Sequence, residues 1–182
     1  MKTSVYGIGN PLIDILAEVN ESSLEKLSLD KGIMKLVSFE EREKIMRHLE
    51  ELGTKYSTGC GGSCPNTMIT LSAMGVKTAL GGKTGHDEFG SVYEAQLKKH
   101  ADIKSALVQC SSPTGSSIIL ITPDSERTMN TFLGANREFA EKDVNEAILD
   151  EADFFYFTGY MWDTENQKGA IEKCLDICRK KK

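Results

Sequence analysis

The stretch Gly59-Cys60-Gly61-Gly62-Ser63-Cys64-Pro65-Asn66-Thr67 decides how the rest of the chain is interpreted. Apolar residues follow it at helical spacing, so the pattern predicts a glycine-rich loop that leads into a helix. We expect Ser63 to cap this helix and Pro65 to lie in its first turn. A helix start of this kind presents N–H donors and the amide of Asn66, which suits an oxygen-rich ligand. A tight loop before a capped helix, with no ligand, explains the same residues.

The composition is that of a soluble globular protein. Of the 182 residues, 40% are hydrophobic and 27% are charged, which is enough for one domain with its own core. The net charge is −5 and only the last four residues are uniformly basic, which argues against a nucleic-acid partner. No apolar run is long enough to cross a bilayer and no leader pattern is present, so we expect a cytoplasmic protein without a membrane partner.

The five cysteines are interpreted as buried or partly buried free thiols. An odd number fits a reducing compartment better than a disulfide framework. Cys60 and Cys64, like Cys174 and Cys178, would share one face of a helix, which leaves zinc binding open. Zinc pairs usually have other spacings and the three histidines do not cluster with these cysteines, so we predict no metal site.

Strands and helices alternate along most of the chain, which predicts an α/β fold with a parallel sheet. Ser38 and Glu41 have capping-box spacing at the start of a helix, and the turn at 123–125 makes 118–133 a hairpin. Extended segments at 12–19, 33–37, 55–57 and 106–109 lack intervening helices at several points and suggest a second, smaller sheet. The predicted strands are residues 4–9, 12–19, 33–37, 77–81, 106–109, 116–122, 127–133 and 154–158. The predicted helices are residues 24–29, 38–52, 87–99, 143–149 and 164–182, besides the one after the glycine-rich loop.

Two glycine motifs imitate nucleotide-binding loops without completing them. Gly82-Lys83-Thr84 resembles the end of a P-loop, but the first glycine of that motif would fall at position 77, which is Lys77. Gly7-Ile8-Gly9 resembles a dinucleotide fingerprint, but the third glycine would fall at position 12, which is Leu12. We interpret both as turn glycines.

Four motifs stand in order along the chain: Gly9-Asn10-Pro11-Leu12-Ile13-Asp14, Gly61-Gly62-Ser63-Cys64-Pro65-Asn66, Gly85-His86-Asp87-Glu88-Phe89-Gly90 and Pro113-Thr114-Gly115. Together they resemble the ribokinase-like (PfkB) family of sugar and nucleoside kinases, over essentially the whole chain. The first motif, with Glu126-Arg127-Thr128-Met129-Asn130 downstream, is most similar to the adenosine-kinase-type branch. Cys64 is a mild departure, since the family often has a smaller residue there.

The resemblance implies a Rossmann-type sheet flanked by helices, with a small β-sheet lid formed by residues 12–19, 33–37, 55–57 and 106–109. The second signature of the family, DTxGAGD, supplies the catalytic aspartate and the anion hole, and it is absent from this sequence. Residues 1–182 would therefore be the N-terminal portion of such a kinase domain, without the C-terminal part of the fold. We expect no catalytic base in this chain, and the chain alone to be inactive.

The implied function is ATP- and Mg²⁺-dependent phosphoryl transfer to a hydroxymethyl group of a nucleoside or sugar, such as adenosine to AMP. This chain would carry the substrate-binding half. Two alternatives stay open: a ribokinase- or fructokinase-type sugar kinase, and a non-catalytic binding fragment. A homodimer through the lid, or through the exposed sheet edge at 154–157, is a further expectation.

The resemblance places substrate hydroxyls against Asp14, Gly62 and Asn66. A carboxylate accepts from two neighbouring hydroxyls, and an asparagine amide both donates and accepts. Asp14 stands in an apolar run, where an unpaired carboxylate is unusual, whereas Asn66 has the alternative of an ordinary early helix residue. Further candidates for the walls of the substrate pocket are Asn10, Leu12, Gly61, Met34, Leu36 and Tyr160.

A phosphate contact is implied for Arg127, whose planar guanidinium can clamp oxygens, and a solvated hairpin arginine is the alternative. We interpret Lys83, Asp87 and Glu88 as loop residues.

Overall fold

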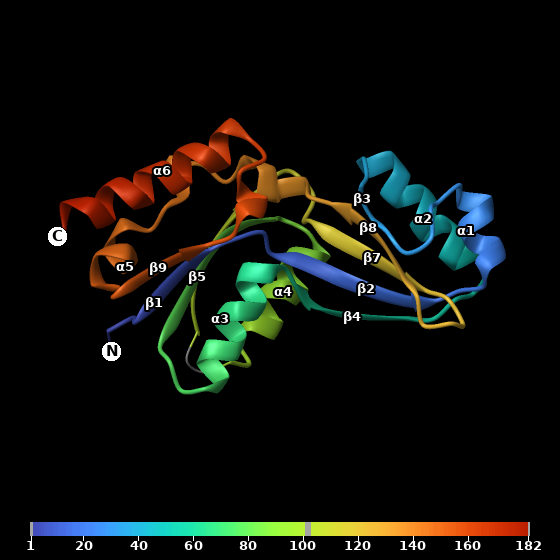
Figure 1. Ribbon diagram of the computed structural model, residues 1–182, viewed down its shortest axis with the longest axis horizontal. Helices are drawn as coiled ribbons and strands as arrows, with labels where there is room; N and C mark the ends of the chain where they lie inside the picture. Colours follow the sequence, from blue (N-terminus) through green and yellow to red (C-terminus); the bar gives the residue numbers. More distant parts are fainter. Residues whose placement is uncertain (1, 101–102, 182) are drawn as a thin grey trace.

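Two β-sheets of different size organise the protein, and the computed structural model describes residues 2–100 and 103–181. The first sheet has four strands, and all of its neighbouring strands run parallel. Helices cover both of its faces, with α3 and α4 on one side and α5 and α6 on the other (Figure 1). Its strands, in spatial order, are β6 (Ile103–Cys110), β5 (Thr78–Gly85), β1 (Val5–Ile8) and β9 (Phe154–Phe157). The four helices are α3 (Ser63–Ala73), α4 (Glu88–Leu97), α5 (Glu146–Glu151) and α6 (Glu165–Lys180).

The second sheet has five strands and extends away from the first, toward the right of Figure 1. This sheet is mixed, since β2 runs parallel to β7 and antiparallel to β4. In spatial order its strands are β3 (Met34–Leu36), β8 (Arg127–Phe132), β7 (Ser116–Ile121), β2 (Leu12–Glu18) and β4 (Tyr56–Gly61). Two helices, α1 (Glu21–Leu27) and α2 (Phe39–Glu51), accompany this sheet. It has one strand more than the parallel sheet, so the expectation of a smaller second sheet is wrong for this chain, but we keep the name small sheet for it below.

Several predicted elements are confirmed where their signals are local. Ser38 caps α2, its hydroxyl accepting from the Glu41 N–H while the Glu41 side chain accepts from the Ser38 N–H. Thr164 caps α6 by accepting from the Gln167 N–H, and Asn145 caps α5 by accepting from the Ile148 N–H. The hairpin is also present: β7 and β8 pair antiparallel, and the Ser125 N–H donates to the Thr122 carbonyl in the turn between them.

The predicted composition of the small sheet is wrong in one strand and incomplete in two. Residues 106–109 belong to β6, which pairs along its whole length with β5 at the edge of the parallel sheet. The hairpin strands β7 and β8 lie in the small sheet instead, beside β2. The three other segments assigned there contribute β2, β3 and β4, as predicted.

The two motifs that resemble nucleotide-binding loops lie mostly inside strands, Gly7 and Ile8 in β1 and 82–84 in β5, with only Gly9 following its strand. Their interpretation as turn glycines is therefore wrong for Gly7 and Gly82. Gly7 lies in β1, with α3 packed so closely that a Cβ would come within 2.8 Å of the Met68 sulfur. Lys83 lies in β5 and not in a loop. Its Nζ pairs with Asp143 Oδ2 at 2.6 Å, and the two side chains are only 6% and 11% exposed. Lys83 therefore anchors the segment after β8 to the parallel sheet.

The alternation of buried side chains along β2 gives the small sheet two different faces. Ile13, Ile15 and Ala17 are buried in an apolar core that also receives residues of α2 and α3. Leu12, Asp14 and Leu16 point the other way and are half-buried. A second core lies between the parallel sheet and helices α5 and α6. The half-buried face of β2 is therefore the one available to a ligand.

Other sequence expectations concern the edges, thiols and helices of the molecule. Strand β9 forms one outer edge of the parallel sheet, and Phe154 is exposed there. All five cysteines are free thiols that are buried or half-buried, as predicted. Among the helices that the structure describes, none combines the length and the apolar character needed to cross a bilayer.

Candidate functional site

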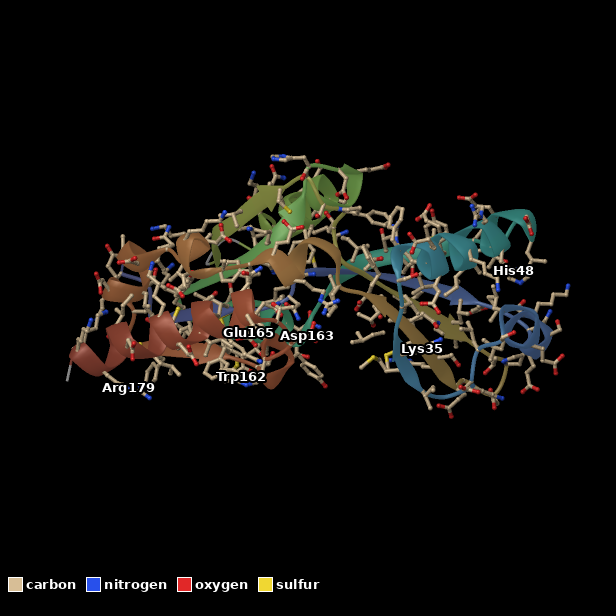
Figure 2. The ribbon with its side chains drawn as sticks, turned by 90° about the horizontal axis from the view of Figure 1, so that it is seen from above. Lys35, His48, Trp162, Asp163, Glu165 and Arg179 are labelled. Carbon is tan, nitrogen blue, oxygen red and sulfur yellow. The ribbon has the colours of Figure 1, made fainter. Side chains whose placement is uncertain are left out.

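A cavity of about 520 Å³ lies between the half-buried face of the small sheet and the carboxyl ends of strands β1 and β9. Asn10 follows β1, and the segment 158–163 follows β9. Figure 2 shows Trp162 and Asp163 on the side of the parallel sheet, across from Lys35 of β3 in the small sheet. In open α/β sheets, ligands bind outside the carboxyl ends of the parallel strands, so this location fits a substrate site.

The floor of the cavity consists of cross-strand rows of the small sheet. The middle row carries Asp14 on β2, Ser117 on β7, Thr131 on β8 and Leu36 on β3. The neighbouring row is apolar and carries Ile119 on β7, Met129 on β8 and Met34 on β3. Leu12 and Leu133 line the cavity on the opposite side of the middle row. A polar row therefore runs between two apolar ones.

Asp14 is the charged residue on this floor. Its carboxylate has no hydrogen bond or ion pair in the described part of the chain, and burial raises its pKa above the ordinary 3.8. It lies directly against Gly61, where an added Cβ would come within 2.1 Å of Asp14 Oδ1. The Tyr93 hydroxyl donates to the Gly61 carbonyl at 3.2 Å and holds this end of β4. The site thus holds a desolvated acceptor that lacks a donor.

The glycine-rich stretch differs from the predicted loop in one respect. Strand β4 continues through Gly61, and Gly62 rather than Ser63 is the N-cap of α3. Gly62 has φ +98°, and a Cβ there would lie 2.2 Å from the Asn10 carbonyl, so the chain needs glycine at this position. The turn is tighter than the expected serine cap allows, and Ser63 is left in the first helical turn beside the cavity.

Two asparagines line the cavity from the side of the parallel sheet. Asn66 lies one turn into α3 and is exposed, and its N–H donates to the Gly62 carbonyl at 2.9 Å. Asn10 is buried, and its Oδ1 accepts from Gln167 Nε2 of α6 at 2.8 Å. Gln167 also donates to the Asn136 carbonyl at 2.9 Å. Helix α6 thereby fixes the orientation of Asn10, a role that the sequence did not indicate.

Aromatic side chains form the wall opposite the small sheet. Tyr160 and Trp162 are 66% and 49% exposed, which is unusual for rings of this size, and both line the cavity. Asp163 beside them pairs with Arg137, Nε to Oδ2 at 3.0 Å. Sequence reasoning proposed Tyr160 but missed Trp162 and Asp163. Exposed rings next to a polar rim suit a flat ligand with polar edges.

The structure brings together most of the residues predicted for the substrate site. Eight of them line the cavity: Asn10, Leu12, Asp14, Met34, Leu36, Gly62, Asn66 and Tyr160. Gly61 lies directly behind Asp14. Arg127 is the exception, since it is exposed at the start of β8 and outside the cavity lining. It lies on the same face of β8 as Met129 and Thr131, which is the face that forms the cavity floor, but at the end of the strand beyond the cavity.

Two of the family motifs meet behind the cavity. Asp87 caps α4, accepting from the Gly90 N–H at 2.8 Å, and also accepts from the Thr114 N–H at 2.7 Å and the Thr114 hydroxyl at 2.5 Å. Burial by itself raises the pKa of Asp87, but the hydrogen bonds from Thr114 and Gly90 outweigh it and leave the pKa lowered. Asp87 and Glu88 are therefore a helix cap and a first helical residue, which corrects their interpretation as loop residues.

A protein-bound metal ion usually requires several donor side chains close together. Within residues 2–100 and 103–181, no group of three or more histidine, cysteine, aspartate or glutamate side chains is placed to hold a metal ion. We therefore assign none of the described residues to a metal ion.

Comparison with known proteins identifies the family. The sequence profile described as pfkB family carbohydrate kinase matches residues 26–182, so the chain belongs to this family. Its strand and helix arrangement agrees with solved structures of similar proteins. It aligns with the crystal structure of adenosine kinase from Sinorhizobium meliloti with a TM-score of 0.82 and 30% identity, over 98% of this chain and 54% of that one. A probable sugar kinase protein from Rhizobium etli gives a TM-score of 0.85 and 29% identity, over 99% and 54% of the two chains.

Two of the curated relatives are named as nucleoside kinases. Adenosine kinase of Dictyostelium discoideum is 29% identical over 159 residues, which cover 84% of this chain and 46% of that protein. Guanosine-inosine kinase of Escherichia coli is 24% identical, over 86% of this chain and 37% of that protein. The chain thus spans about half the length, or less, of the relatives that it matches.

Proposed function

We propose that this chain is the substrate-binding part of an ATP-dependent kinase that phosphorylates the hydroxymethyl group of a nucleoside, with adenosine as the preferred candidate. The observation that carries this proposal is Asp14, a desolvated carboxylate without a partner among the described residues, on the floor of a cavity with mostly apolar and aromatic walls. A ligand with two neighbouring hydroxyls and a flat apolar part satisfies both features. The relatives named adenosine kinase and guanosine-inosine kinase support the same class.

The residues around Asp14 would bind and orient such a ligand. The Asp14 carboxylate accepts from both ribose hydroxyls, and the Gly62 backbone, which has no side chain to intervene, lies against the ring. Asn66 contributes an amide at the start of α3. The base then lies between the apolar rows of the small sheet and the rings of Tyr160 and Trp162. Binding at both ends fixes the hydroxymethyl group, and positioning of this kind is the main contribution of protein to phosphoryl transfer.

The phosphate side of the reaction is assigned to residues outside this chain, with one exception. ATP and Mg²⁺ would supply the phosphoryl group and neutralise its charge, and the signature that carries the catalytic aspartate of the family is absent from this sequence. Arg127 is the proposed phosphate contact. Because it lies beyond the outer end of the cavity floor, such a contact requires the small sheet to bend toward the parallel sheet.

A sugar kinase is the second candidate, and it is favoured by the similarity to the probable sugar kinase protein from Rhizobium etli. Asp14 suits the hydroxyls of a sugar as well as those of ribose. A non-catalytic binding fragment is the third, since the chain covers about half of its relatives.

A panel of nucleosides and sugars in a coupled assay of ADP release tests these candidates with the intact protein. We expect turnover of adenosine, and no turnover by the 182-residue chain alone. Turnover of ribose or fructose with no nucleoside accepted would favour the sugar kinase. Absence of turnover with every compound would contradict both kinase proposals and leave the binding fragment. Calorimetry with the 182-residue chain adds one check, because tight binding of ATP would show that this chain contains the nucleotide site.

A further inference from the structure

The middle row of the cavity floor contains a pair of hydroxyl groups. Ser117 Oγ and Thr131 Oγ1 are 3.0 Å apart, and either atom can be the donor. Their residues are only 6% and 8% exposed, and both line the cavity. The rows on either side are apolar, so these hydroxyls are, with Asp14, the polar groups of the floor.

The mutual hydrogen bond leaves part of this pair unused. Two hydroxyls carry two protons and four lone pairs, and one bond between them uses one proton and one lone pair. The described part of the chain provides no other hydrogen bond to either oxygen. One donor and several acceptor positions thus remain beside the cavity, and a buried hydroxyl without a partner is unfavourable.

Thr128, on the same strand as Thr131, is an example of a buried hydroxyl with a structural role only. It lies on the other face of β8, is equally buried, and its oxygen accepts from the Gly32 N–H at 3.0 Å. Thr128 therefore has a backbone partner, whereas among the described residues the cavity-side pair has only itself.

The register sets the distance between this pair and Asp14. Neighbouring strands lie about 4.8 Å apart, so Ser117 is about 5 Å from Asp14 and Thr131 about 10 Å from it. A single sugar ring held by Asp14 would end near Ser117. A nucleoside held in the same way would continue along the row and bring its base to Thr131.

We propose that Thr131, paired with Ser117, is a specificity-determining residue that hydrogen-bonds the polar edge of the base of a nucleoside substrate. This inference rests on the proposed kinase function and goes beyond it, because it separates nucleosides from sugars by one row of side chains. The pair can donate or accept, since rotation of the two hydroxyls reverses the direction of the hydrogen bond between them.

The test compares adenosine with ribose in the intact protein, with ribose followed as a substrate or as a competitive inhibitor. In Thr131→Val, which keeps the shape of the side chain, we expect kcat/KM for adenosine to fall about tenfold, while the value for ribose stays within twofold. Thr131→Ser restores the hydroxyl and should recover most of the adenosine activity. Thr128→Val is the matched control, because it removes an equally buried hydroxyl from the opposite face of the same strand.

The possible results separate the inference from the function on which it rests. An equal loss for adenosine and ribose in Thr131→Val, or no loss for either, overturns the inference while the kinase proposal stands. The same holds if Thr128→Val reproduces the adenosine-selective loss, or if the wild type accepts sugars but no nucleoside. A wild type that turns over none of the compounds contradicts the function itself.

Discussion

Replacing Asp14 by alanine removes the carboxylate around which the proposed substrate site is built. In the folded chain this group has no partner among the described residues, so its acceptor capacity is available to a ligand. A hydrogen bond to a charged group contributes about 1.5–3 kcal/mol, and two ribose hydroxyls would share this carboxylate. We therefore expect Asp14→Ala to cost about 2–4 kcal/mol in kcat/KM, roughly a 30- to 1,000-fold loss.

The same carboxylate should have the opposite effect on stability, and its pKa gives the sign. Burial raises the pKa of Asp14 above its ordinary 3.8, so the folded state holds this proton more tightly than the unfolded state does. The favourable contribution of Asp14 to the stability of the folded state is complete below pH 3.8. It is lost as the pH rises through the raised pKa of the folded state. At pH 7 the ionised group therefore destabilises the free protein. Asp14→Asn, which keeps the shape but not the charge, should be more stable than wild type at pH 7, and the difference should disappear as the pH falls toward 3.8.

Two measurements on the intact protein check this pair of effects: steady-state kinetics with adenosine, and urea unfolding between pH 4 and pH 8. Glu18→Ala is the control, because Glu18 lies on the same strand and the same face but is exposed beyond the cavity. It should change neither quantity. Unchanged kcat/KM in Asp14→Ala would remove this residue from the site. A loss of stability in Asp14→Asn at pH 7 would show that the carboxylate has a structural partner and would refute the reasoning.

Three further predictions concern residues around the same sheet. Gly61→Ala should displace the Asp14 carboxylate and lower kcat/KM for the nucleoside at least tenfold. Gly59→Ala, on the same strand with open space around it, should leave the kinetics unchanged, and equal effects of the two variants would contradict the packing argument. Asn130 is 1% exposed, and neither of its amide atoms has a partner in the part of the chain that the structure describes. Asn130→Leu should therefore raise the free energy of unfolding by about 1–2 kcal/mol in urea denaturation without changing substrate binding, and a lower midpoint would count against it. Arg127→Ala should lower kcat by about 100-fold with little change in KM for the nucleoside, since its proposed role is a phosphate contact; a change confined to KM would point to substrate binding instead.

Short-range signals in the sequence were sufficient for individual elements. The capping box of Ser38 and Glu41 and the turn at 123–125 involve residues within a few positions of each other, and their hydrogen bonds form as predicted. The alternation along β2 places Asp14 on the face away from the core for the same reason, because side chains of a strand alternate between its faces. The motif set, though dispersed, was sufficient to predict the family.

Only the tertiary structure decided which strands share a sheet and which side chains meet. The segments 106–109 and 116–121 look alike locally, yet one extends the parallel sheet and the other joins β2, because sheet membership depends on hydrogen bonds to strands far away in the sequence. The contact of Gln167 with Asn10 spans 157 positions. The pairing of Ser117 with Thr131 likewise acquires a role only when register places it in one row with Asp14. Local pattern determines the face on which a side chain lies, whereas its neighbours are determined by the packing of the whole chain.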